Sequence, residues 1–189
     1  MRSPLYFIVK PFENKRYANS KKIGDKSIVT SSNEEDHTSV NRLAIVVATP
    51  AHYKGPVKDG DMLLIHHNVF KVHRDTRGWR ANSFAYFNEE TFCINEDQFF
   101  MYKNDDGWHA HDRHSFVKPV AVENDYKIHK RGLYEPLKGV MMYPTDYLLD
   151  NGIDRGDVVG FTPESEYEFE VDGEVLYRVF DHQITIKYD

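Results

Sequence analysis

Apolar and polar residues alternate with a period of two in the best-patterned segments of this chain. In residues 167–171 the apolar side chains fall on one face and the carboxylates on the other, and residues 184–188 alternate in the same way. This period is typical of half-buried β-strands. Gly60 and Gly156 mark turns, and Asp172-Gly173 has the composition of a two-residue hairpin turn. Since only Tyr143 to Asn151 offers a short helical turn, the pattern predicts an all-β protein.

Short segments of the first half recur in the same order in the second half. The offset between the copies falls from 108 to 96 to 84 residues, so the second copy is shorter in two connections. This order indicates a tandem duplication, although one β-domain with repeated turn chemistry would leave a similar trace. The matched pairs are Phe7 to Pro11 with Ser115 to Pro119, Val57 to Asp61 with Ile153 to Asp157, Asn88 to Glu90 with Asp172 to Glu174, and Asp97 with Asp181.

The duplication predicts two domains, residues 1–103 and residues 108–189. Between them lies Lys103-Asn104-Asp105-Asp106-Gly107, a polar stretch that ends in glycine and is typical of a boundary.

Each half resembles a GroES-type co-chaperonin subunit over nearly its whole length. The resemblance implies two GroES-like β-barrels in tandem, which bind a chaperonin ring through apolar residues on mobile loops and help to enclose an unfolded protein. It also implies a homo-oligomer that needs no cofactor and carries out no catalysis. It rests on these segments, in order: Pro4 to Pro11, Lys26 to Ser31, Arg42 to Ala48, Val57 to Asp61, Glu174 to Tyr177, and Asp181 to Ile186.

The chain departs from that family in three ways. It is duplicated, the connections Thr49 to Val57 and Pro144 to Ile153 are short where the family carries a roof hairpin, and the first half has an insertion around His73 to Ala81. Ring size and closure of the dome are therefore left open.

The first candidate binding loop spans residues 12–41, which are rich in charged and small polar residues. Such a segment buries too little apolar area to offset its ordering entropy, so we expect it to be mobile in the free protein. Within it, Ser27, Ile28, Val29 and Thr30 stand where the resemblance places the docking residues. The alternative is a disordered insertion without a partner.

The second candidate loop spans about residues 122–139. Leu133 and Tyr134 are its candidate docking residues, although Glu135 follows them where the family has an apolar residue. The alternative is a plain connection, with Leu133 and Leu137 packed on the barrel.

Composition argues against several classes of protein. The net charge is −6 without a long basic block, which argues against nucleic acid as the main partner. No stretch reaches the ~18–20 apolar residues of a membrane span, and no signal-peptide core is present. Cys93 is the only cysteine, so an intrachain disulfide is excluded and we expect a cytoplasmic protein.

Other chemistry is present only in weak form. His109, His111 and His114 suggest a metal, but on a straight strand only the first two share a face. We predict no metal site and no enzyme. The two alternatives are a structural or adaptor protein built from the same barrels, and a metal-dependent enzyme that uses these histidines.

Overall fold

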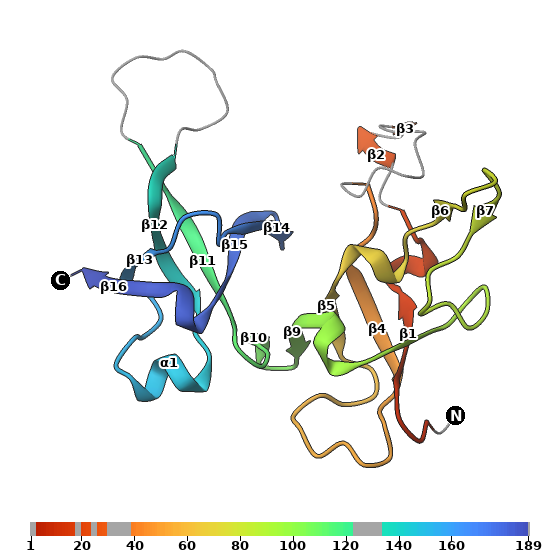
Figure 1. Ribbon diagram of the computed structural model, residues 1–189, viewed down its shortest axis with the longest axis horizontal. Helices are drawn as coiled ribbons and strands as arrows, with labels where there is room; N and C mark the ends of the chain where they lie inside the picture. Colours follow the sequence, from red (N-terminus) through yellow and green to blue (C-terminus); the bar gives the residue numbers. More distant parts are fainter. Residues whose placement is uncertain (1–2, 18–19, 24–25, 30–38, 123–133, 189) are drawn as a thin grey trace. The chain divides into compact units, whose positions relative to one another are not determined.

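The computed structural model describes the backbone of residues 3–17, 20–23, 26–29, 39–122 and 134–188, and the side chains of these residues outside 20–29. The chain divides into two compact units, Met1–Gly107 and Trp108–Asp189. Figure 1 shows both units as small, strand-rich bodies.

The first unit is built on an antiparallel sheet with the strand order β10-β9-β5-β4-β1-β8, in which the edge strand β10 continues past Gly107 into residues of the second unit. Two further two-stranded sheets, β2-β3 and β6-β7, lie outside this order. The elements are β1 (Phe7–Pro11), η1 (Phe12–Asn14), β2 (Ser20–Ile23), β3 (Lys26–Val29), β4 (Leu43–Ala48), β5 (Met62–Ile65), η2 (His67–Val69), β6 (His73–Arg74), β7 (Arg80–Ala81), β8 (Phe92–Ile94), η3 (Glu96–Gln98), β9 (Phe99–Asn104) and β10 (Gly107–Ala110), where η denotes a 3-10 helix.

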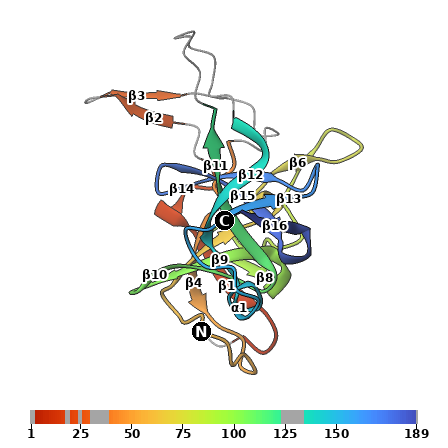
Figure 2. The same cartoon turned by 90° about the vertical axis from the view of Figure 1, so that its left-hand side faces the viewer.

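The second unit is built on an antiparallel sheet with the order β14-β15-β11-β12-β13-β16. Figures 1 and 2 place α1 at one end of this unit, opposite the end where β11 finishes and β12 starts. The elements are β11 (His114–Ala121), β12 (Tyr134–Tyr143), α1 (Asp146–Asp150), β13 (Val158–Phe161), β14 (Tyr167–Val171), β15 (Glu174–Phe180), η4 (Asp181–Gln183) and β16 (Ile184–Tyr188).

The two sheets repeat one topology. The order β9-β5-β4-β1-β8 of the first corresponds strand by strand to β16-β13-β12-β11-β15 of the second. Val9 pairs with Val46 on β4 and with Phe92 on β8. Its counterpart Val117 pairs with Met141 on β12 and with Tyr177 on β15. The same backbone positions therefore meet across the strands in both units.

The irregularities of the sheets repeat as well. The register shifts between Ile8 and Val9 in β1, and between Phe116 and Val117 in β11. A second shift lies between Leu64 and Ile65 in β5, and between Gly160 and Phe161 in β13. Because β-bulges are local features that bend and twist a strand, their recurrence is stronger evidence for a repeated unit than strand order alone.

The turn that leads into β5 and β13 also has the same chemistry in both units. Asp61 accepts a hydrogen bond from the Lys58 backbone at 2.7 Å, as Asp157 does from the Asp154 backbone at 2.7 Å. The intervening Gly60 and Gly156 both have a φ of 98°, a region that disfavours side chains.

One of the matches made from sequence is wrong by one residue. Ile65 pairs with Phe99 and Phe161 pairs with Ile184, so Asp181 is the counterpart of Glu96, whereas Asp97 corresponds to His182. The carboxylates at 97 and 181 resemble each other in sequence but occupy different positions of the short 3-10 turn.

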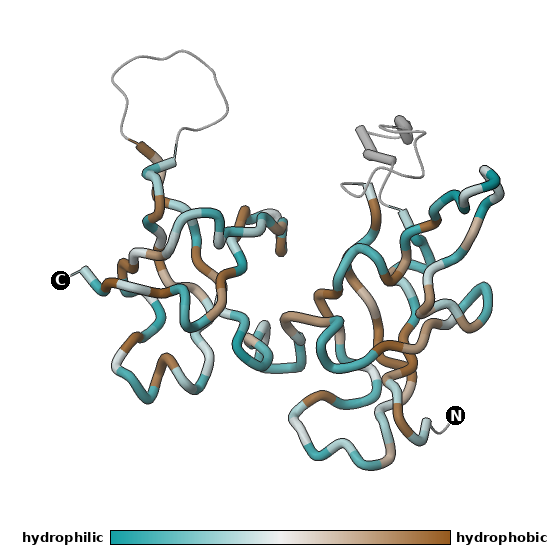
Figure 3. The backbone as a smooth tube through the Cα atoms, viewed as in Figure 1, coloured by the Kyte–Doolittle hydropathy of each residue, from teal (hydrophilic) through white to brown (hydrophobic). Residues whose placement is uncertain are grey.

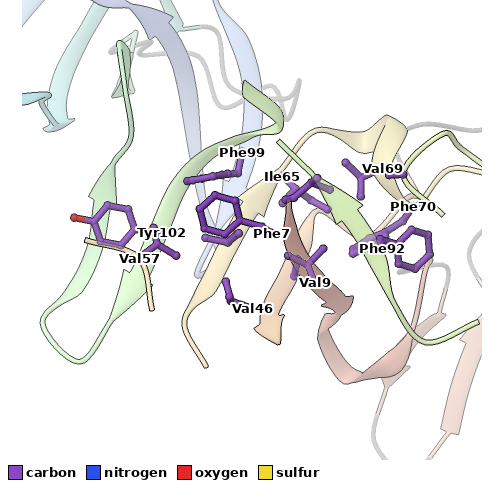
Figure 4. Close-up of a cluster of buried hydrophobic side chains, with 14 of the residues drawn as sticks. Phe7, Val9, Val46, Val57, Ile65, Val69, Phe70, Phe92, Phe99 and Tyr102 are labelled. Carbon is purple, nitrogen blue, oxygen red and sulfur yellow. The ribbon is translucent and has the colours of Figure 1, made fainter. Parts of the chain in front are cut away.

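Aromatic side chains fill the core of the first unit (Figure 4). Phe7 packs edge-on against Tyr53 and Phe99, with ring centroids 4.8 and 5.3 Å apart. Phe70 and Phe92 form another edge-on pair at 4.7 Å. Edge-to-face pairs suit the quadrupoles of the rings and add about 0.5–1.5 kcal/mol beyond the burial of their area.

One buried cluster of the second unit is mainly aliphatic, while Phe116 and Phe169, also buried, meet edge-on at 5.9 Å outside it. Buried residues come from β11, β12, α1, β13 and β15, so the short helix closes one side of this core. In Figure 3 hydrophobic colouring marks parts of these strands. The buried members are Val117, Met141, Leu148, Val159, Phe161 and Val179.

These sheets confirm the prediction of an all-β protein, and the helical turn expected within Tyr143 to Asn151 is α1. None of the sheets in the described residues closes into a barrel, because β8 does not pair with β9 or β10, nor β14 with β16. Among these residues no helix is both long and apolar enough to cross a bilayer.

Candidate partner-binding loops

Both candidate loops occupy the same connection of the repeated sheet. The first joins β1 to β4, and the second joins β11 to β12, which are corresponding pairs of neighbouring strands. A connection between the same two strands leaves each sheet at the same place. The two predicted loops therefore leave their units from equivalent positions of the sheet, although the loops differ in length.

The predicted docking residues of the first loop lie on a β-hairpin. β2 pairs with β3 in antiparallel register, with Lys21 opposite Ile28 and Ser20 opposite Val29. Ser27, Ile28 and Val29 are thus consecutive residues of β3, whereas Thr30 lies outside the described residues. Figure 1 shows this hairpin separate from the core strands, as the sheet assignment also has it. The backbone of the docking segment is extended, which suits strand-like contact with a groove.

Arg16 fixes the point at which the first loop leaves the unit. Its Nε donates to the carbonyl of Phe70 at 3.0 Å and its Nη1 donates to Oδ1 of Asn82 at 2.9 Å. Its guanidinium also lies over the ring of Phe92, 5.2 Å from the centroid. One side chain therefore ties the start of the loop to the core strand β8 and to the segment that follows η2.

The return of the loop is held in the same way. Tyr17 bridges to Val40, and its hydroxyl accepts a hydrogen bond from the Val72 backbone at 2.8 Å. The Asn41 amide donates to the carbonyls of Phe12 and Lys15 at 3.1 and 2.8 Å. Both ends of the segment 12–41 consequently pack on the first unit, so the part available for docking is shorter than the sequence indicates.

The sequence contains no local signal for this anchoring. Arg16 stands in a row of charged residues, and its partners Phe70 and Asn82 are more than fifty residues away. Only the fold brings these positions together, so pattern analysis counted Arg16 and Tyr17 as parts of a polar loop.

The second loop is also narrower than predicted. Tyr134 begins β12 and pairs with Ala121, so residues 134–139 belong to the sheet. Tyr134 is exposed, and its ring meets that of Tyr177 edge-on at 6.3 Å. Leu133 lies outside the described residues. Leu137 is exposed and has a φ of 57°, at an irregular part of the strand, so it does not pack in the core.

The histidine group does not assemble a metal site within the part of the chain that the structure describes, where no three suitable His, Cys, Asp or Glu side chains converge. His111 and His114 bracket a tight turn, in which the His114 backbone donates to the His111 carbonyl at 3.1 Å. Burial lowers the pKa of His111. Burial, together with the nearby charge of Arg178, lowers the pKa of His114 to about 4. His114 is therefore neutral at pH 7.

Asp181, which the sequence analysis matched to Asp97 without predicting its burial, ties the second unit together. Asp181 accepts hydrogen bonds from Ser115 at 2.6 Å and from Thr145 at 2.8 Å. Thr145 also caps α1 through the Leu148 backbone at 3.4 Å. The three side chains join β11, α1 and η4. We interpret them as a structural network, because both carboxylate oxygens are already engaged by protein hydroxyls.

The remaining candidate chemistry has structural explanations. Glu168 and Glu170 are exposed on β14 while Phe169 and Val171 are buried, as the alternation predicts. Cys93 is partly buried in β8, and this burial raises the pKa of its thiol. A raised thiol pKa disfavours the reactive thiolate at pH 7.

Comparison with known proteins assigns no relative: no protein-family model and no curated protein matches this chain.

Proposed function

We propose that this protein is a non-catalytic co-chaperonin, a homo-oligomeric lid that caps a chaperonin ring and helps to enclose an unfolded protein. In this proposal each unit is a GroES-like domain, and the ATP chemistry belongs to the chaperonin. The observation that carries it is the placement of Ile28 and Val29 on the β2-β3 hairpin, outside the core sheets, on a loop that leaves the repeated sheet between β1 and β4.

The energetics favour weak binding by each single loop and tight binding by an assembly that carries several loops. Burial of Ile28 and Val29 in a groove gains ~25 cal/mol per Å² of apolar surface. Ordering the loop costs about 2–5 kcal/mol of that gain. Several loops held in one assembly raise the effective concentration at the ring, so the lid binds tightly while each contact remains reversible.

The anchoring of the loop ends supports this arrangement. Arg16, Tyr17 and Asn41 hold both ends of the loop within a few ångströms of the first unit. A loop with fixed ends pays less conformational entropy on docking than one whose base is also mobile. Substitution of Arg16 should therefore weaken docking without removing the docking residues.

The decisive substitution is Ile28→Asp. A carboxylate on β3 cannot enter an apolar groove without loss of hydration, so binding to a GroEL-type chaperonin ring with nucleotide should fall at least tenfold. Binding is measured by sedimentation of the mixture and by the mass of the native assembly, with and without the ring. The matched control is Leu5→Asp, which puts the same charge on an exposed apolar residue outside the loop.

Equal affinity of wild type and Ile28→Asp would remove the first loop from the proposal. Failure of the wild type to bind any chaperonin, with oligomers intact, would favour a structural or adaptor protein. A stoichiometric metal in elemental analysis of the purified protein would instead favour the metal-dependent alternative.

A further inference from the structure

The first unit carries a hairpin that the second unit lacks. In the first unit β5 and β8 are separated by η2 and by β6-β7, whereas in the second unit residues 162–166 lead from β13 directly to β14. Figure 1 shows β6-β7 as an arm that extends beyond the core strands. Its turn is well organised, because Asp75 accepts hydrogen bonds from the backbones of Arg77 and Trp79 at 2.9 and 2.8 Å.

This arm exposes the residue types that dominate protein interfaces. Trp79 is 73% exposed, and Phe84 and Phe87 that follow are exposed too. Trp and Arg are enriched among the residues that carry most of the binding energy at interfaces. An exposed tryptophan on an organised hairpin, followed by two exposed phenylalanines, indicates a surface that a partner covers.

The charge of the arm indicates an acidic partner. Residues 71–80 hold four basic side chains, Lys71, Arg74, Arg77 and Arg80, and one acidic side chain, Asp75. Arg74 lies directly opposite Arg80 in the β6-β7 pair. Like charges at directly opposed positions destabilise a strand pair, and a negative surface laid against them would relieve this repulsion.

A matching surface is present on the second unit of the same chain. The outer face of β14 presents Glu168 and Glu170, which are exposed. Across the strand pair Glu170 faces the half-buried Val175, and Glu168 faces Tyr177, which packs partly on the core cluster of its own unit. The exposed Tyr134 lies beside Tyr177. An apolar strip beside two carboxylates complements a tryptophan beside arginines.

The two units also differ in net charge, and the unit that carries the acidic face is the more acidic one. Met1–Gly107 contains 15 Lys and Arg against 14 Asp and Glu, whereas Trp108–Asp189 contains 9 against 16. The acidic balance of the second unit supplies, on the same chain, a protein surface of the charge that the basic arm would contact. Aromatic burial supplies the affinity, and the charges orient the encounter.

We propose that the β6-β7 arm of one copy docks on the outer face of β14-β15 in a second copy of this chain. The proposal rests on the homo-oligomer of the proposed function but requires no chaperonin. Since the two patches differ, each copy supplies one arm and one face, and the contact closes by reciprocal exchange into a two-fold dimer or continues head-to-tail into a ring or filament.

Charge reversal on the full-length chain tests the contact. One variant carries Arg74→Glu with Arg77→Glu, and another carries Glu168→Lys with Glu170→Lys. Sedimentation velocity and native mass at low and high salt measure assembly, and circular dichroism checks the fold. We expect each variant alone to dissociate at least tenfold more readily than wild type. Their equimolar mixture should reassemble, because each arm then meets a face of opposite charge.

Two controls separate this contact from general effects of charge and folding. Lys10→Glu with Lys54→Glu changes the net charge equally at exposed positions outside the arm, and should assemble like wild type. Trp79→Ala should weaken assembly at least tenfold, whereas Trp79→Phe, which keeps an aromatic ring, should weaken it less.

Assembly of both reversed variants like wild type, no recovery in the mixture, or a monomeric wild-type chain would each overturn the contact. The result also distinguishes the two proposals. Assembly without binding to a chaperonin removes the lid function and keeps this interface, whereas a monomer that binds the ring through its loops does the reverse.

Discussion

The two units share a sheet topology and register but carry different side chains at corresponding positions. Phe7 and Ser115 occupy the same position of the repeated sheet, opposite Ile94 and Val179. Phe7 packs edge-on with Tyr53 and Phe99, whereas Ser115 donates to the buried Asp181. One register thus supports an aromatic core in the first unit and a hydrogen-bonded network in the second.

The corresponding strands β9 and β16 also share a register but differ in burial. Met101 in β9 and Ile186 in β16 pair with corresponding residues of β5 and β13. Met101 is fully buried, whereas Ile186 is 51% exposed. Register determines which backbones meet, while burial depends on what lies over the strand.

Phe7→Ala should destabilise the first unit by about 3–5 kcal/mol, because truncation of a buried phenylalanine leaves a cavity among aromatic rings. Hydrogen exchange of peptides from each unit, measured in urea, should show the loss in residues 1–107 only. Leu5→Ala, at an exposed position nearby, is the control and should change stability by less than about 0.5 kcal/mol. Equal loss in both units would mean that they unfold as one.

Acid should weaken the second unit through His114. Its folded pKa of about 4 lies below the ordinary value of 6.5, so the unfolded chain binds the proton more readily. The stability is therefore complete above about pH 6.5 and is lost as the pH falls toward 4, by about 3 kcal/mol at most. The corresponding residue of the first unit is Tyr6, so the histidine is present in the second unit alone of this pair.

Urea unfolding at pH 7.5, 5.5 and 4.5, followed by the fluorescence of the buried Trp108 in a Trp79→Phe background, measures this effect. Substitution His114→Phe should remove most of the difference between pH 7.5 and 4.5. A pH dependence that survives this substitution unchanged would assign it to other groups, such as the carboxylates of the unit.

Ser115→Ala should cost about 1.5–3 kcal/mol, the typical contribution of a hydrogen bond to a charged group. A double-mutant cycle with Thr145→Ala should give a non-additive result, because both hydroxyls donate to Asp181. Glu96→Ala tests the corresponding carboxylate of the first unit, which is exposed, and should have little effect. Strict additivity in the second unit would contradict a shared network.

Gly60→Ala and Gly156→Ala should each cost about 1–2 kcal/mol, since both backbones adopt a φ of 98° and no neighbouring atom obstructs a Cβ. The reason is backbone strain alone, so the two losses should agree closely. Unequal losses, measured by unit-resolved hydrogen exchange, would show that the repeated turns are not energetically equivalent.

Much of the scaffold could be predicted from the sequence. Period-two alternation in residues 167–171 reports which side chains face a core, and glycine in the turns at 60 and 156 reports a backbone that other residues avoid. These signals depend on residues close together in the chain, so they can be interpreted without knowledge of the fold. Closed barrels were also predicted, but sheet closure depends on whether edge strands meet, and no local pattern records that.

The candidate site was predictable only in part. The apolar pair Ile28-Val29 stands out from a polar segment, and that contrast identifies it without a structure. The anchoring of the loop through Arg16 and Tyr17 does not appear in the pattern, because Phe70, Val72 and Asn82 reach them across more than fifty residues. The complementarity of the arm and the β14-β15 face likewise became visible only when exposure was known.

By itself, the sequence determined the strand class, the repeat and the chemistry of the turns, because each depends on interactions between residues close in the chain. The tertiary structure decided the registers, the burial of Asp181 and His114, and the exposure of Trp79. Those properties arise when distant segments pack together, and the free energy of a side chain then depends on neighbours that its own sequence context does not specify.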